Sequence, residues 1–79
     1  MSDMSEYCKN SLITEIGIVA GEIWHFLDRN GKVDLSVLFA GIEHPKELVL
    51  MSLGWLAREG HVCVWQAGGK YQVNLSKPG

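Results

Sequence analysis

Histidine and cysteine side chains are the groups in this chain best suited to hold a metal ion, and one pair has a usable spacing. His61 and Cys63 lie two residues apart, so both would point to the same face of a strand. Such a pair could form half of a zinc site. No CxxC or HxxxH pairing supplies the other half. We therefore interpret His61 and Cys63 as an edge-strand pair and expect no metal site and no cofactor.

Residues suited to acid–base or nucleophilic catalysis are equally sparse. Glu22 and His25 lie one helical turn apart, but they have no serine or cysteine nucleophile nearby. Gly68-Gly69 lacks the context of a phosphate-binding loop, because it joins two expected strands. We expect no enzymatic activity and no small-molecule substrate. Cys8 and Cys63 match no redox spacing, which favours reduced thiols.

Size and net charge narrow the classes of protein to which this chain could belong. The 79 residues are 47% apolar and 20% charged, which is typical of one small globular domain. Seven Lys and Arg against nine Asp and Glu give a net charge of −2, and the positive residues form no run that would bind nucleic acid or an anionic membrane. The first ten residues are polar, resemble no signal peptide and are expected to be loose. No stretch has the length of a membrane span, so we expect a cytoplasmic protein.

Two helices are predicted in the first half of the chain. The apolar spacing indicates a helix over Leu12–Leu27, capped by Asn10 or Ser11 and stopped at Asn30-Gly31. Its core stripe consists of Ile13, Ile16, Ala20, Ile23 and Leu27. An extended piece at Lys32-Val33-Asp34 then leads to a brief helix over Leu35–Ala40, which Gly41 ends.

A third helix is predicted over Pro45–Glu59, with its proline at the first helical position and Gly60 just past its end. Its core stripe consists of Val49, Ser52, Leu53 and Leu56. Together with the brief helix before it, this helix forms a helix-turn-helix.

After Gly60 the period of the apolar residues changes from 3.6 to 2 residues, which indicates two strands over 61–66 and 70–75. Gly68-Gly69 suits a two-residue turn between them. The turn would set Ala67 opposite Lys70, Val64 opposite Val73 and Val62 opposite Leu75. Apolar residues then meet apolar partners across the strands, which supports a hairpin in this register.

The LSVLFAG helix and turn, the stripe before Arg58-Glu59-Gly60 and the Gly68-Gly69 hairpin together resemble a known fold. Over about residues 11–75 the order of three helices, a short strand and a C-terminal hairpin is similar to the winged helix-turn-helix, an α+β fold. The match extends to a family of short, stand-alone bacterial winged-helix domains of uncharacterised function, and implies a single domain over residues 1–79. The resemblance implies binding to DNA or to proteins, without deciding between them.

The outer face of the third helix is unusual, because it carries an apolar strip in place of charge. The strip consists of Leu50, Met51, Gly54 and Trp55. A glycine inside a helix costs about 1 kcal/mol relative to alanine, and at this position it would let another backbone approach closely. We therefore predict a protein-contact surface, with a homodimer as the simplest arrangement. Ile18, Tyr7 or Trp65 would have to extend it, because specific interfaces bury about 1,000 Å² or more.

The alternative for this strip is that Trp55 and Leu50 fold under the hairpin or the N-terminal segment. A competing function is a DNA-binding regulator, because the third helix of a DNA-binding winged helix enters the major groove and the wing touches the backbone. The residues that would serve nucleic acid are Lys46, Arg58, Trp65 and Lys70. The phosphate contacts would be few, which predicts weak duplex binding at physiological salt. Trp65 could stack on a single-stranded base or pack against a neighbouring element.

Overall fold

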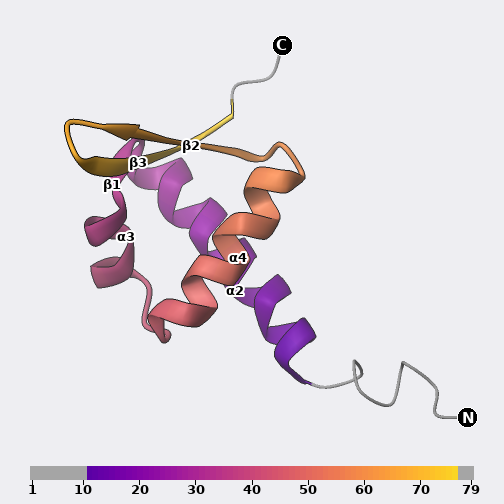
Figure 1. Ribbon diagram of the computed structural model, residues 1–79. Helices are drawn as coiled ribbons and strands as arrows, with labels where there is room; N and C mark the ends of the chain where they lie inside the picture. The colour runs from indigo at the N-terminus through magenta and orange to yellow at the C-terminus, as the bar shows by residue number, and fades with distance from the viewer. Residues whose placement is uncertain (1–10, 77–79) are drawn as a thin grey trace, which may run out of the picture.

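The computed structural model describes residues 11–76, and Figure 1 shows its three helices beneath a small antiparallel sheet. The elements in chain order are α2 (Ser11–Asn30), β1 (Val33–Asp34), α3 (Leu35–Gly41), α4 (Lys46–Arg58), β2 (Val62–Ala67) and β3 (Lys70–Leu75). The predicted α+β class and the predicted order of elements are confirmed. The expected loose segment over residues 1–10 lies outside the described residues, as do Tyr7, Cys8 and Asn10.

Helix α2 buries the predicted stripe along most of its length, and Gly31 stops the helix with φ 75°. The prediction for Ile13 was wrong, because this side chain is 59% exposed. Helices α2 and α4 cross in Figure 1, so the first turns of α2 run past the crossing point and away from the sheet. Periodicity places Ile13 on the correct side of the helix but does not reveal where its neighbours end.

Helix α3 includes Gly41, one residue more than predicted. A Cβ atom at this position would lie 2.3 Å from Cε1 of Phe26, so the glycine lets α3 approach the aromatic ring of α2. The turn that follows is tied to α2 by His44, whose Nε2 lies 3.3 Å from Oε1 of Glu22. Glu22 therefore faces His44, whereas the ring of His25, one helical turn from Glu22, packs edge-on against Trp24.

Helix α4 begins one residue later than predicted, because Pro45 is its N-cap and not its first helical residue. The Pro45 carbonyl accepts hydrogen bonds from the amides of Leu48 and Val49. Gly60 has φ 80°, as predicted for the residue past the end. The predicted core stripe is buried and Leu48 joins it. The Ser52 hydroxyl is fully buried and has no hydrogen-bond partner among residues 11–76.

The hairpin has the predicted register, with Val64 opposite Val73 and Val62 opposite Leu75. Gly68 and Gly69 both have positive φ, at 60° and 80°, which is the conformation of a type I′ turn. Strand β3 also pairs with β1, so the sheet order is β1-β3-β2. Strand β3 is therefore central, and β2 lies at one edge.

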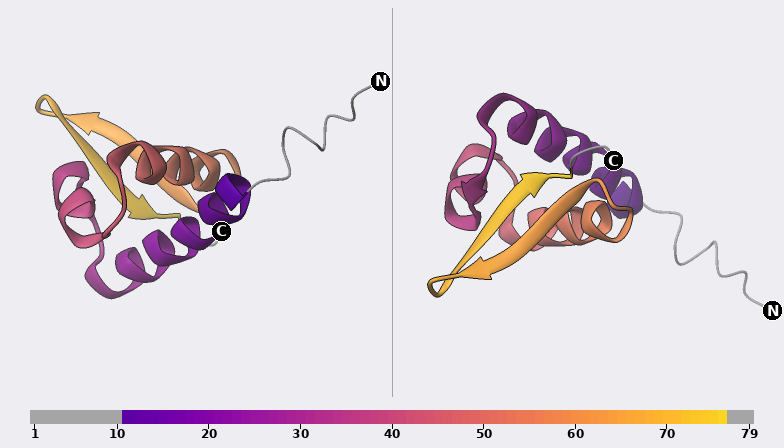
Figure 2. Two further views of the ribbon diagram at one scale, coloured as in Figure 1. Left: turned by 90° about the horizontal axis from the view of Figure 1, so that it is seen from below. Right: turned by 90° about the horizontal axis from the view of Figure 1, so that it is seen from above.

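The core lies between the helices and one face of the sheet, and Figure 2 shows the hairpin extending beyond the helices at its turn. Val62 and Val73 are buried there, whereas Val64 and Tyr71 share their face but remain exposed. Within the described part of the chain, no helix has the length and apolar character needed to cross a membrane.

Candidate functional site

The outer face of α4 is open to solvent. Its side chains Leu50, Met51 and Trp55 are 47%, 44% and 54% exposed. A Cβ atom built on Gly54 would meet no heavy atom within 4 Å. These four residues are called the α4 surface below. Their exposure excludes packing of Leu50 and Trp55 beneath the hairpin; the other alternative, cover by the N-terminal segment, involves residues outside the described ones.

The α4 surface continues into an apolar groove between α4 and α2. Ile13, Ile16, Gly17 and Trp55 line this groove, whose volume is about 270 Å³. Gly17 lacks a side chain, and a Cβ atom there would meet nothing within 4 Å, so the glycine leaves the groove open. The lining residues of the groove come from α2 and α4, the two helices that cross in Figure 1.

Sequence reasoning missed this groove, because it assigned Ile13 to the core and gave Gly17 no role. The available signal was their spacing of four residues, which places both on one side of the helix beside the core stripe. That signal identifies a shared helix face, but it does not identify α4 as the opposite wall.

Two of the four residues proposed for nucleic acid come together at a second hollow. Lys46 of α4 and Lys70 of β3 line a volume of about 370 Å³, together with Tyr71. The Lys46 Nζ atom lies 5.4 Å from the ring centroid of Phe39, a cation–π geometry. Lys70 is partly neutralised, because its Nζ atom lies 3.8 Å from Oδ2 of Asp34.

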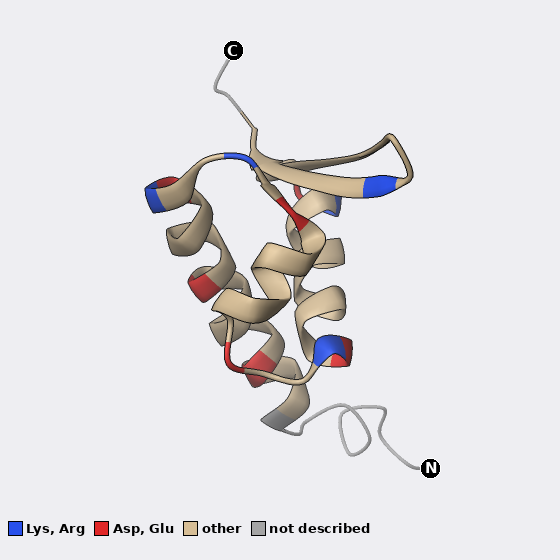
Figure 3. Cartoon of the chain, turned by 90° about the vertical axis from the view of Figure 1, so that its left-hand side faces the viewer, with Lys and Arg blue, Asp and Glu red and all other residues tan. Residues whose placement is uncertain are grey.

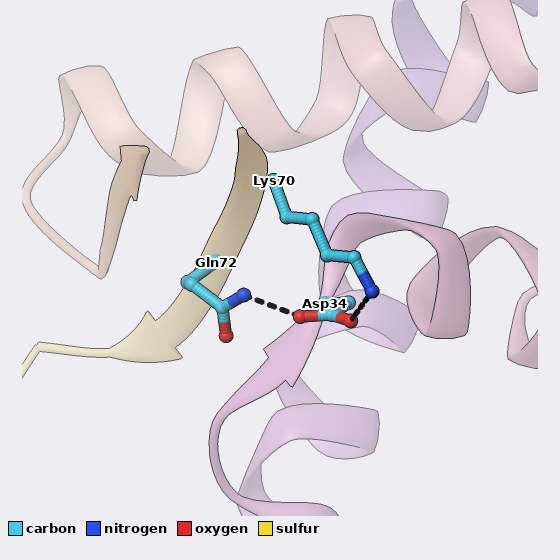
Figure 4. Close-up of polar contacts among 3 residues, drawn as sticks. All are labelled: Asp34, Lys70 and Gln72. Carbon is cyan, nitrogen blue, oxygen red and sulfur yellow. Dashed lines mark hydrogen bonds and ion pairs between the residues drawn. The ribbon is translucent and has the colours of Figure 1, made fainter. Parts of the chain in front are cut away.

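Asp34 also ties this hollow to the sheet. Its Oδ1 atom accepts a hydrogen bond from the Gln72 side-chain amide, so the carboxylate bridges two residues of β3 (Figure 4). The same Asp34 pairs with Gln72 in the β1–β3 ladder. The half of the hairpin next to its turn is therefore fixed to the strand that precedes α3.

The other two proposed nucleic-acid residues lie elsewhere. Arg58 is at the C-terminal end of α4, about 18 Å along the helix from Lys46 at 1.5 Å per residue. Trp65 lies on the hairpin face opposite to Val64 and is partly exposed. Figure 3 shows positive residues on separate elements with negative residues between them. The described residues thus present a pair of lysines, and not a continuous basic surface.

The residues considered for metal binding are not brought together into a site. His61 and Cys63 are exposed at the start of the hairpin, and the Cys63 Sγ atom lies 3.4 Å from Oγ of Ser76. Across residues 11–76 no three His, Cys, Asp or Glu side chains gather in a way that could hold a metal ion.

Comparison with known proteins agrees with the geometry. A family model described as a winged helix-turn-helix domain (DUF2582) matches residues 8–75. No curated protein matches the sequence.

Proposed function

This chain belongs to the family of winged helix-turn-helix domains (DUF2582), and we propose that it is a non-enzymatic interaction module that self-associates or docks a protein partner through the α4 surface. Winged-helix domains are typically binding modules, and their fold does not decide what they bind. The observation that supports the proposal is the exposure of Leu50, Met51 and Trp55 around an open Gly54.

Covering this surface with a partner would contribute a considerable free energy of binding for so small a domain. A fully buried aromatic side chain covers about 150–250 Å², so the 54% exposure of Trp55 corresponds to roughly 100 Å². At about 25 cal/mol per Å² this area is worth about 2–3 kcal/mol when covered. Single exposed apolar residues are common, but a helix face that adjoins an apolar groove is typical of a contact site.

The proposal is tested by size-exclusion chromatography with light scattering on the wild type and on Met51→Glu. We expect the wild type to exceed the 8.8 kDa mass of one chain and the variant to shift toward it. Val37→Glu is the matched control, because Val37 of α3 is exposed to a similar degree, 46%, but lies outside the α4 surface. A monomeric wild type that elutes like both variants would refute self-association through this surface.

A DNA-binding regulator is a second candidate, and the convergence of Lys46 and Lys70 on one hollow favours it. Two phosphate contacts would make the logarithm of the binding constant fall with the logarithm of salt concentration with a slope of about −2. Titration of random duplex DNA at low salt measures this slope, and Lys46→Gln should lower it by about one. Arg29→Gln is the control, because Arg29 lies in the last turn of α2 and is not among the residues that line the hollow. Absence of salt-sensitive binding by the wild type would remove this candidate.

A further inference from the structure

Strand β2 is an edge strand without the usual protection against pairing. The sheet order β1-β3-β2 leaves its outer edge unpaired by any strand of residues 11–76. Its sequence, VCVWQA, contains no charge and no proline, and five of its six residues are exposed. Natural edge strands are normally protected by lysine, proline, bulges or a covering element, because their free backbone groups are a template for another strand.

The hairpin turn decides which backbone groups of β2 face outward. The pair that flanks a two-residue turn, Ala67 and Lys70, is hydrogen-bonded, and hydrogen-bonded pairs then alternate along the ladder. Cys63, Trp65 and Ala67 therefore bond to β3. The N–H and C=O groups of Val62, Val64 and Gln66 point away from β3, and the backbone hydrogen bonds of the described residues outside the ladders include none to them.

We propose that a second copy of this chain pairs with β2 in antiparallel orientation, with the two-fold axis at Val64, to form one sheet that is continuous across both copies. This inference rests on the proposed function, for which it names the partner. The uncharged strand supports a second copy as the occupant, because no like charges would face one another across the pair.

Symmetry restricts the register. A two-fold axis perpendicular to the sheet keeps each side chain on its own face, and residues directly opposite one another must share a face. One residue must therefore lie opposite its own copy. With Val64 at that position, Val62 lies opposite Gln66, and all three outward-facing residues of β2 are paired by about six backbone hydrogen bonds. If the two-fold axis passed through Cys63 or Trp65 instead, only two of the three outward-facing residues of β2 would find partners within the strand.

Helix α4 lies where it can complete the interface. It packs against β2, and Figure 2 shows both elements on the side of the molecule away from α2. Leu50 and Trp55 are about 140° apart around the helix. Since Trp55 faces the groove at α2, Leu50 lies toward the opposite flank, with the open Gly54 between them.

The surface area that a stable dimer must bury also favours an interface that includes both β2 and α4. A standard interface takes about 800 Å² from each partner, which is about one seventh of the 5558 Å² that this chain exposes. A single strand edge is too narrow to supply that area. Because α4 packs against β2, the proposed dimer would have to cover the flank of α4 with Leu50 and Gly54 in addition to the edge of β2.

The test compares three variants by sedimentation equilibrium, with far-UV circular dichroism to verify folding. Val64→Lys would place two ammonium groups beside the two-fold axis, so we expect at least a tenfold rise in the dimer dissociation constant. Tyr71→Lys is the matched control: it adds the same charge on the same hairpin face, but on β3, which lies between β1 and β2 in the sheet. Its dissociation constant should stay within about twofold of the wild type. Met51→Glu tests the α4 surface separately.

Hydrogen exchange gives a direct reading of the strand pairing. In the dimer the amides of Val64 and Gln66 should exchange at least tenfold more slowly than in dilute monomer, whereas the Trp65 amide, already bonded to β3, should change least. Dimerisation that is lost in Met51→Glu but intact in Val64→Lys, with fast exchange at Val64, would overturn the β2 pairing and leave the proposed function standing. A wild type that is monomeric at all concentrations would overturn the β2 pairing and the self-association part of the proposed function, and would leave docking of a different protein as its remaining form.

Discussion

A substitution at Gly54 should change the stability of a single chain and the association of two chains in opposite directions. Replacing it with alanine adds one methyl group in the interior of α4, where a Cβ atom would meet no heavy atom within 4 Å. The substitution should therefore cause no strain in the single chain. Alanine is favoured over glycine in a helix interior by about 1 kcal/mol, so Gly54→Ala should stabilise the monomer by about that amount. For a domain of this size this corresponds to a rise in Tm of about 4–8 °C.

The same methyl group should weaken self-association. If the α4 flank of a second copy approaches Gly54, the added atoms must be accommodated between two helices, and overpacking of this kind costs about 1–3 kcal/mol. We expect the dimer dissociation constant to rise by about tenfold or more. The prediction thus has opposite signs for the two measured quantities, which a general effect on folding would not produce.

The assay pairs urea unfolding at low micromolar concentration, followed by tryptophan fluorescence, with sedimentation equilibrium at high concentration. Gly21→Ala is the matched control, because Gly21 is also an exposed glycine inside a helix with nothing within 4 Å of its Cβ position. The control should gain stability without any change in association. A loss of stability in dilute Gly54→Ala, or an unchanged dissociation constant, would refute the reasoning.

Three further predictions concern the folding of a single chain. Gly41→Ala should lower the free energy of unfolding by about 1–3 kcal/mol, since its Cβ would lie 2.3 Å from the Phe26 ring; urea denaturation measures this loss, and an unchanged midpoint would contradict the close approach. Ser52→Ala should raise stability by about 1 kcal/mol, because its buried hydroxyl has no hydrogen-bond partner within residues 11–76; a lower thermal midpoint would mean that the hydroxyl is bonded. Gly68→Asn should be stabilising by up to about 1 kcal/mol, because asparagine tolerates the positive φ of a type I′ turn and restricts the unfolded chain; differential scanning calorimetry would detect it, and destabilisation would argue against that turn type.

Local patterns predicted those parts of the fold whose geometry is set by near neighbours. The two-residue turn at Gly68-Gly69 fixes the parity of the hairpin, so the pairing of Val64 with Val73 followed from the sequence. The buried stripe of α4 followed from its 3.6-residue period in the same way. Both predictions use only residues that lie within one hairpin or one helix.

The parts that escaped prediction depend on elements that meet across the fold. The exposure of Ile13 depends on where α4 crosses α2, and the groove needs Gly17 and Trp55 from different helices. The pairing of Asp34 with Gln72 joins residues 38 positions apart and makes β3, and not β2, the central strand. An alternating pattern identifies a strand without identifying both of its neighbours.

The two functional hypotheses use overlapping parts of the same helix. A duplex read by α4 would have to lie against its outer face, which carries Leu50 and Gly54, the residues that the proposed dimer would cover. A second copy that covered this flank would therefore exclude the duplex from the centre of the helix. The Lys46–Lys70 hollow lies next to the turn of the hairpin and at the N-terminus of α4, so a second copy on this flank would leave it open. Two lysines, one of them paired with Asp34, would then be the contacts left for phosphate. Under the proposed pairing, self-association and reading of DNA bases by α4 would therefore compete for one surface, and the apolar composition of that surface is the feature that supports self-association.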